Sequence, residues 1–204
     1  MILTLWHGGH DLEYTYKENL SSKKGRWEHG AGLYLTTHYE TARKYSKGNG
    51  KTYEVTLELD PEKCISNMHI PSQAALDFYS KNLKKSSLEM CSTGLHNTMK
   101  RMNNFETVCA DSFQNLIINY EAITNSKTHL ITQFLVEHGI QYGLVKNFGG
   151  RDENVIVVYD KNIIKKVESI PAKMVSLDLF ERPFPETNFK MILSDQEKRK
   201  IKPT

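Results

Sequence analysis

The chain has 204 residues, of which 39% are hydrophobic and 10% aromatic, and its formal net charge is +3 at pH 7. The apolar content excludes a disordered chain, and the length predicts a single domain, 1–204, with room for an insertion. The mild positive charge permits a nucleic-acid partner, but the chain lacks the strongly basic composition that would indicate one.

Cysteine usage and hydropathy exclude further classes of protein. The three cysteines show no C-x-x-C spacing, so the sequence predicts neither a zinc site nor a disulfide framework. Segment 1–14 has no basic region followed by a long apolar run, and no window approaches the roughly 20 apolar residues that span a bilayer. We therefore expect a cytoplasmic protein with no membrane partner.

The first predicted strand, 2–6, is apolar and is followed by His7, Gly8 and Gly9. Because glycine has no side chain, the two glycines allow a close approach to the backbone at the end of this strand. A short helix is predicted over 12–20, followed by a polar loop.

The segment 30–46 (GAGLYLTTHYETARKYS) predicts a turn, a strand and a helix in close succession. Its first glycines permit a tight turn, and 33–35 is a compact β-prone run. Thr37 and Glu40 have the spacing of a capping box, which predicts that the helix begins at Thr37. The helix keeps Tyr45 near the strand that carries Tyr34.

After a turn at 48–50, the segment 51–59 alternates with a period of two and predicts a strand that ends at Asp60-Pro61. Its buried face is expected to carry Tyr53, Val55, Leu57 and Leu59.

The segment 68–138 has few β-branched runs and several helix-start signals, which predict a helical insertion. Helices are expected over 73–83, 95–102, 111–123 and 127–137, with a break at 92–94. The basic residues of this block are Lys81, Lys84, Lys85, Lys100 and Arg101. Two interpretations of them stay open, a solvated helix face and a surface that contacts phosphate.

Strands return at 142–146 and at 153–159, which is the most apolar strand and is expected to be central, and 161–167 extends or follows it. The intervening segment 147–152 predicts a glycine-bearing loop. The tail over about 170–204 contains several prolines and a charged end, and we expect it to be partly irregular.

Four features together resemble the ADP-ribosyltransferase superfamily, in its histidine-tyrosine-glutamate branch of poly-ADP-ribose polymerases and diphtheria-toxin-like enzymes. They are Trp6-His7-Gly8 after a strand, Gly32-Leu33-Tyr34 in a strand, Tyr45 eleven residues after Tyr34, and Val157-Val158-Tyr159-Asp160 at the end of an acid-headed strand. The resemblance covers about 2–59 and 140–167. It implies an α+β fold with a split mixed or antiparallel β-sheet core and a helical insertion.

The resemblance also implies an activity. It implies a mono-ADP-ribosyltransferase that uses NAD as a substrate and needs no metal. Small phage and toxin–antitoxin ADP-ribosyltransferases share this compact layout, which implies a toxin or a phage–host conflict effector. An antitoxin or inhibitor protein is then an expected partner, beside the macromolecule that accepts ADP-ribose.

The implied NAD site uses residues from the first third of the chain. Tyr34 and Tyr45 stack on the nicotinamide ring, the backbone of Gly8 reads its amide, and His7 bonds the adenosine ribose. In place of the serine that contacts the nicotinamide amide in the polymerases, this chain has Ala42. Two alternatives stay open: Ser46 or a backbone group is the substitute, or Gly8 alone recognises the amide.

The implied catalytic acid lies at the head of strand 153–159, where two candidates stay open. When Val158-Tyr159-Asp160 is aligned with the end of the family's strand without a gap, Val155 stands where the family has its glutamate. Glu153 and Asp152 lie two and three residues before Val155. A bulge at the head of the strand would bring Glu153 into place. Glu153 is preferred because it shares a face with Val155.

The acceptor is the least specified part of the prediction. Asp152 is a candidate to orient a nucleophile, Arg151 to contact a phosphate, and Phe148 to stack on a base from an exposed loop. Nucleic acid, RNA or DNA, is slightly favoured over protein.

Two other functions compete with the enzyme. One is an inactive module of the same fold that binds NAD or a partner. The other is a nuclease built on His7, His10 and His29.

Overall fold

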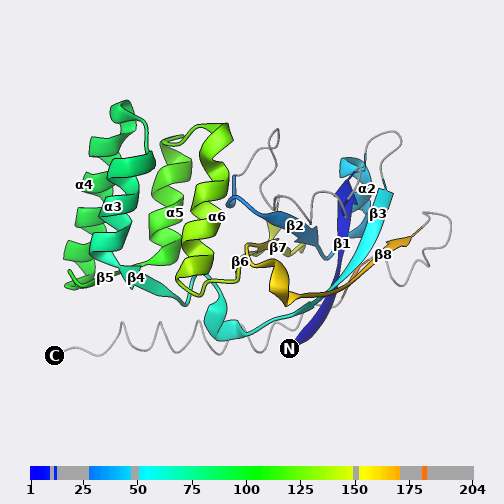
Figure 1. Ribbon diagram of the computed structural model, residues 1–204. Coiled ribbons are helices and arrows are strands. Elements are labelled where there is room, and N and C mark those ends of the chain that lie inside the picture. The colour runs from blue at the N-terminus through cyan, green and yellow to red at the C-terminus, as the bar shows by residue number, and fades with distance from the viewer. Residues whose placement is uncertain (10–11, 13–27, 47–50, 149–151, 171–180, 183–204) are drawn as a thin grey trace.

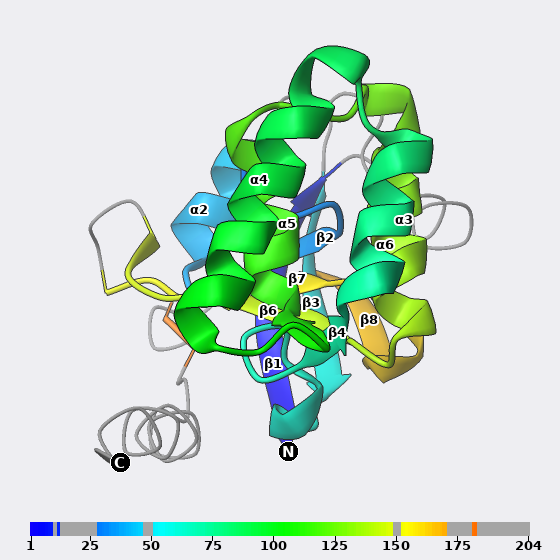
Figure 2. The same ribbon diagram turned by 90° about the vertical axis from the view of Figure 1, so that its left-hand side faces the viewer.

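The computed structural model describes residues 1–9, 12, 28–46, 51–148, 152–170 and 181–182. It has two parts, a six-stranded sheet and a block of helices (Figure 1). In Figure 2, turned by 90°, the helices lie in front of the sheet. The α+β class that the sequence predicts is therefore confirmed. Residues 13–20 of the predicted helix 12–20, the turn 48–50 and most of the tail after 170 lie outside the described residues.

All strand pairs in the six-stranded sheet are antiparallel, and the strand order is β6-β7-β2-β1-β3-β8. The strands are β1 (Ile2–Gly9), β2 (Leu33–Thr36), β3 (Lys51–Glu58), β6 (Tyr142–Val145), β7 (Val155–Val158) and β8 (Ile164–Ile170). Each strand that the sequence predicts is present, although several of their ends differ by a few residues.

The sheet is nearly divided in its middle. Strands β1 and β3 pair through eight residues of each strand, and β2 and β7 pair through four. In contrast, β1 and β2 share a single register pair, Trp6 with Thr36. The sheet therefore consists of two half-sheets, β6-β7-β2 and β1-β3-β8, and we call the junction between them the split.

The strand β3 confirms the period-two prediction. Tyr53, Val55, Leu57 and Leu59 are all buried, and they belong to one apolar cluster with Leu5 of β1. Alternation works here because one face of an antiparallel strand packs on the core while the other faces water.

Strand β7 is interior, as predicted, with β6 and β2 as its neighbours. All four of its residues are buried. Val155 and Val157 pack against the helical block, while Ile156 and Val158 pack in the cluster on the other face. Burial on both faces explains why this strand is continuously apolar.

The helical block lies between β3 and β6 in the chain. Its helices are α3 (Ser72–Asn82), α4 (Lys85–Met102), α5 (Ala110–Asn119) and α6 (Thr128–Glu137). Two short strands, β4 (His69–Pro71) and β5 (Thr107–Cys109), pair at its base and were not predicted from the sequence. None of the helices in the described part of the chain is long and apolar enough to cross a membrane.

The predicted break at 92–94 is wrong, because α4 runs through it without interruption. A Cβ added at Gly94 would lie 2.5 Å from Cδ2 of Leu116 on α5. Glycine therefore serves close packing between α4 and α5, and tertiary contact overrides its low helix propensity.

The predicted capping box is also wrong. The helix α2 (Tyr39–Tyr45) begins two residues after Thr37, and its N-cap, His38, makes no side-chain capping bond. The Thr37 hydroxyl instead accepts a hydrogen bond from the backbone N–H of Asn154, at 3.0 Å. Thr37 thus joins the end of β2 to the segment before β7.

Aromatic rings form the centre of the helical block. Phe113 is fully buried, and its ring centroid lies 5.1 Å from that of Tyr79 and 4.9 Å from that of Phe134.

We expect Phe113→Ala to lower the free energy of unfolding by about 3–5 kcal/mol, measured by urea denaturation, because it leaves a cavity. Phe105→Ala is the control, since Phe105 is 53% exposed. Equal losses in the two variants would contradict this picture of the core.

Candidate functional site

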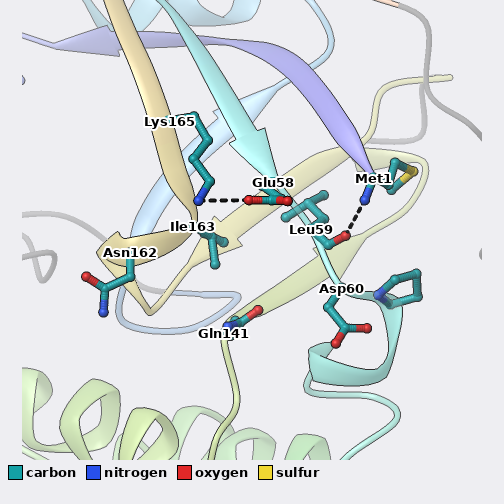
Figure 3. A pocket seen from close by; sticks show the side chains of 9 residues that line it. Met1, Glu58, Leu59, Asp60, Gln141, Asn162, Ile163 and Lys165 are labelled. Atoms are coloured by element: carbon teal, nitrogen blue, oxygen red, sulfur yellow. Dashed lines mark hydrogen bonds and ion pairs between the residues drawn. The ribbon is translucent and has the colours of Figure 1, made fainter.

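A cavity of about 430 Å³ lies at the N-terminal end of β1 (Figure 3). Its walls carry charges of both signs, and Glu58 and Lys165 form an ion pair across 2.8 Å there. Its lining residues are Met1, Glu58, Leu59, Asp60, Pro61, Gln141, Asn162, Ile163 and Lys165. His7 lies six residues after Met1, which lines this cavity. At the rise of a β-strand, this separation is roughly 20 Å. The cavity is therefore distinct from the predicted site.

His7 joins the two half-sheets at the other end of β1. Its Nδ1 lies 2.9 Å from the backbone carbonyl oxygen of Tyr34 on β2. Because a carbonyl oxygen only accepts, Nδ1 carries the proton, and Nε2 is left as an acceptor. Burial lowers the pKa of His7 below its ordinary value of 6.5, and the hydrogen bond to Tyr34 opposes part of this shift. The imidazole is therefore neutral at pH 7.

Because Gly9 has no side chain, it does not cover Nε2, the acceptor nitrogen of His7. A Cβ added at Gly9 would lie 2.8 Å from Nε2 of His7. A larger residue would press on the nitrogen that is available for a ligand hydroxyl.

Tyr34 is held by the loop that precedes β2. Its hydroxyl donates to the carbonyl of Gly30 at 2.8 Å and accepts from the N–H of His29 at 3.1 Å. Burial raises the pKa of Tyr34, and negative charge on Glu28 and Tyr45 would add to the shift. Its ring packs against the apolar core of the helical block. The helical block therefore supports one side of the predicted slot.

The helix α2 lies directly against the end of β1. A Cβ added at Gly8 would lie 1.6 Å from the backbone oxygen of Ala42, so only glycine permits this packing. Ala42 is buried against Trp6 and Tyr39. The sequence predicted that something approaches the backbone closely at Gly8. On one side of the strand, that partner is the helix α2 and not a ligand.

Tyr45 and Ser46 lie at the C-terminal end of α2. Tyr45 is 60% exposed, so its ring is available to a ligand. The hydroxyl of Ser46 donates to the carbonyl of Arg43 at 2.7 Å and helps to end the helix. The hydroxyl that the sequence offered for the nicotinamide amide is therefore already bonded within the end of α2.

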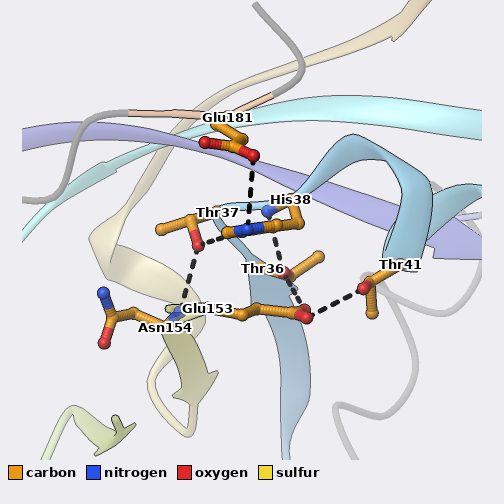
Figure 4. Close-up of polar contacts among 7 residues, drawn as sticks. All are labelled: Thr36, Thr37, His38, Thr41, Glu153, Asn154 and Glu181. Carbon is orange, nitrogen blue, oxygen red and sulfur yellow. Dashed lines mark hydrogen bonds and ion pairs between the residues drawn. The ribbon is translucent and has the colours of Figure 1, made fainter. Parts of the chain in front are cut away.

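Glu153 is almost completely buried, with 2% of its surface exposed. The hydroxyl of Thr36 donates to Oε1 at 2.5 Å, and the hydroxyl of Thr41 donates to Oε2 at 2.9 Å (Figure 4). Thr36 belongs to β2 and Thr41 to α2. The carboxylate thus lies between these two elements, at the head of β7.

The bulge expected at the head of β7 does not form. The pairing of β2 with β7 is regular, from Leu33 with Val158 to Thr36 with Val155. Glu153 lies two residues before this ladder and reaches the sheet with its side chain alone. Val155, at the in-register position, packs instead into the core of the helical block.

The three residues that the sequence proposed for the acceptor site differ in their exposure and in whether the structure describes them. Asp152 is exposed, and Arg151 lies outside the described residues. Phe148 was expected on an exposed loop, and this is wrong. Phe148 is partly buried, its ring centroid lies 5.5 Å from that of His29, and its N–H donates to the carbonyl of Glu153 at 2.7 Å. The hairpin between β6 and β7 folds this ring inward.

Residues 181–182 cross the split beside Glu153, which the sequence did not indicate. The N–H of Arg182 donates to the carbonyl of Thr37 at 2.8 Å. Its guanidinium pairs with Glu54 of β3 and lies 4.8 Å from the centroid of the Trp6 ring. His38 and Glu181 form an ion pair of 3.8 Å when the histidine is charged (Figure 4). Arg182 thus contacts both half-sheets.

No group of three or more His, Cys, Asp or Glu side chains that could hold a metal ion occurs in the part of the chain that the structure describes. Comparison with family models, curated proteins and solved structures finds no match to this chain.

The neutral state of His7 predicts a pH dependence of stability. The folded protein binds the His7 proton more weakly than the unfolded chain, so stability is lost as the pH falls below about 6.5. Between pH 7 and pH 5, the free energy of unfolding of the wild type should fall more steeply than that of His7→Asn. The difference is at most about 1.4 kcal/mol per pH unit, measured by urea denaturation. Parallel curves would contradict a neutral, partly buried His7.

The contacts of Arg182 predict that it stabilises the junction of the half-sheets. We expect Arg182→Ala to lower the free energy of unfolding by about 1–3 kcal/mol, because it removes a partly buried ion pair and a cation–π contact. The matched control is Arg43→Ala, which breaks an exposed ion pair with Glu40 and should cost less than about 0.5 kcal/mol. Equal thermal melting temperatures for wild type and Arg182→Ala would show that the contact contributes nothing.

Proposed function

We propose that the chain is an NAD-dependent mono-ADP-ribosyltransferase that modifies a macromolecule. The observation that carries the proposal is that His7 and Glu153 both bond β2, the strand of Tyr34: His7 bonds the backbone carbonyl of Tyr34, and Glu153 bonds the hydroxyl of Thr36. His7, Tyr34 and Glu153 come from β1, β2 and the segment before β7, which are adjacent in the sheet although far apart in the sequence. These are the three residue types that the histidine-tyrosine-glutamate branch uses.

Four residues near the split are assigned to the binding of NAD. The Nε2 atom of His7 accepts a hydrogen bond from a ribose hydroxyl of the adenosine half. The exposed ring of Tyr45 stacks on the cationic nicotinamide, an interaction of about 1 kcal/mol. Tyr34 forms the wall opposite, and the backbone groups of Gly8, next to His7 on β1, are assigned to the amide of nicotinamide.

Glu153 acts on the bond that breaks. In the reaction, the N-glycosidic bond to C1′ of the ribose breaks, and nicotinamide leaves with the bonding electron pair. Positive charge then develops on the ribose, and a carboxylate that hydrogen-bonds its 2′-hydroxyl stabilises that charge. The acceptor forms the new bond to C1′ and loses its proton to solvent or to a nearby base, for which exposed Asp152 is the candidate.

Nucleic acid is the slightly preferred acceptor, with protein as the other class. Lys81, Lys84, Lys85, Lys100 and Arg101 are all exposed on and around α3 and α4, where phosphate groups can reach them. The resemblance to small phage and toxin–antitoxin ADP-ribosyltransferases supports a cytoplasmic role as a toxin or phage–host conflict effector, with an antitoxin or inhibitor protein as partner.

One observation favours a second function, a module that binds NAD or a partner without catalysis. Val155 occupies the in-register position at the head of β7, and both oxygens of Glu153 already accept hydrogen bonds. In this module the carboxylate is structural, and NAD binds without turnover.

Labelled NAD distinguishes the two functions. The protein is incubated with NAD labelled in its adenylate half and with separate DNA, RNA and protein fractions, and label in one fraction identifies the acceptor class. We expect Glu153→Gln to reduce transfer by about 10²–10³-fold, because it removes the charge that stabilises the ribose cation. Tyr45→Ala should raise KM for NAD about fivefold.

Glu137→Gln is the matched control, since Glu137 is exposed on α6, and its transfer should equal that of the wild type. Transfer that survives Glu153→Gln would exclude Glu153 as the catalytic acid. Calorimetric binding of NAD with label in no fraction would favour the module.

A further inference from the structure

The carboxylate of Glu153 is buried in an unusual way. A buried carboxylate is normally paired with a cation, because desolvation of the charge is costly. In the part of the chain that the structure describes, no lysine or arginine forms an ion pair with Glu153. Two neutral hydroxyls, those of Thr36 and Thr41, take the place of a cation.

The direction of the Thr36 hydrogen bond is determined by its other partner. The backbone N–H of His38 donates to Oγ1 of Thr36 at 3.0 Å. The hydroxyl proton of Thr36 is therefore free to point at Oε1 of Glu153, which only accepts when ionised. His38, Thr36 and Glu153 form a chain of hydrogen bonds in one direction.

The second hydroxyl comes from a different element. Thr41 lies on α2 next to Ala42, whose backbone oxygen packs against Gly8 of β1. The two oxygens of the carboxylate are thus held separately, one by β2 and one by α2. An acid held at both oxygens cannot rotate about its last bond without losing one of these contacts.

We propose that Thr36 and Thr41 are positioning residues that orient the Glu153 carboxylate for catalysis. The inference rests on the proposed function, because it gives the two hydroxyls a part in the cleavage of NAD. Each oxygen of an ionised carboxylate has two lone pairs, so one remains on each for the ribose 2′-hydroxyl. The hydroxyls neither touch the substrate nor transfer a proton to it, and they act only through Glu153.

The test compares threonine variants in steady-state cleavage of NAD. Thr36→Val and Thr41→Val keep the shape of the side chain and remove the donor. We expect kcat to fall about 10- to 100-fold, with KM for NAD changed less than about twofold, because a small misplacement of a catalytic group costs rate rather than binding. Thr36→Ser and Thr41→Ser retain the hydroxyl and should restore most of kcat.

Thr56→Val is the matched control. The hydroxyl of Thr56 pairs with that of Thr4 at 3.1 Å between β3 and β1, away from Glu153, so its removal should leave kcat unchanged. If Thr36→Val fails to fold, Thr41→Val still decides the question, because Thr41 is only partly buried.

The outcomes separate the two proposals. Wild-type protein that cleaves no NAD overturns the proposed function and the catalytic role of the hydroxyls with it. Cleavage that Glu153→Gln abolishes, and that Thr41→Val leaves intact, overturns the positioning role alone. A loss of kcat in both valine variants that serine does not restore would also overturn it, because the hydroxyl would then not be the group that matters.

Discussion

The structure depends on the single register pair between Trp6 and Thr36. An antiparallel ladder normally satisfies the backbone groups of both strands along their length. Where the ladder stops, other groups must connect the two half-sheets. His7 donates to the carbonyl of Tyr34 on one side of this pair, and Arg182 bonds the backbone of Thr37 on the other. The residues that bridge the gap in the sheet therefore also surround the proposed site.

Two helical elements pack against the strands that border this gap. The helix α2 packs on the end of β1 through Gly8 and Ala42, with the backbone of one in contact with the backbone of the other. The helical block packs against Tyr34 and against the inner residues of β7. A site built from strands that are supported on both sides retains its geometry better than one built on loops. The block thereby has a part in the site even though none of its residues belongs to the proposed NAD contacts.

Glu153 is buried against two hydroxyls, and no lysine or arginine in the described part of the chain forms an ion pair with it. Hydroxyl groups are weaker partners than a guanidinium, but they do not neutralise the carboxylate. A carboxylate that keeps its negative charge is what a developing ribose cation requires. The same arrangement would also serve a structural acid, which is why turnover and its dependence on the threonine hydroxyls decide between the two roles.

The sequence by itself determined most of the local elements, because their signals come from neighbouring residues. Alternation in 51–59 identified β3 and its buried face, and the continuous apolar run after Glu153 identified an interior strand. Only the tertiary structure decided the rest. Gly94 lies inside a helix because Leu116 packs on it, and Thr37 bonds Asn154 instead of capping α2. The sequence could place Glu153 on the face of Val155, but its hydroxyl partners lie 117 and 112 residues away, and no local pattern encodes contacts over such distances.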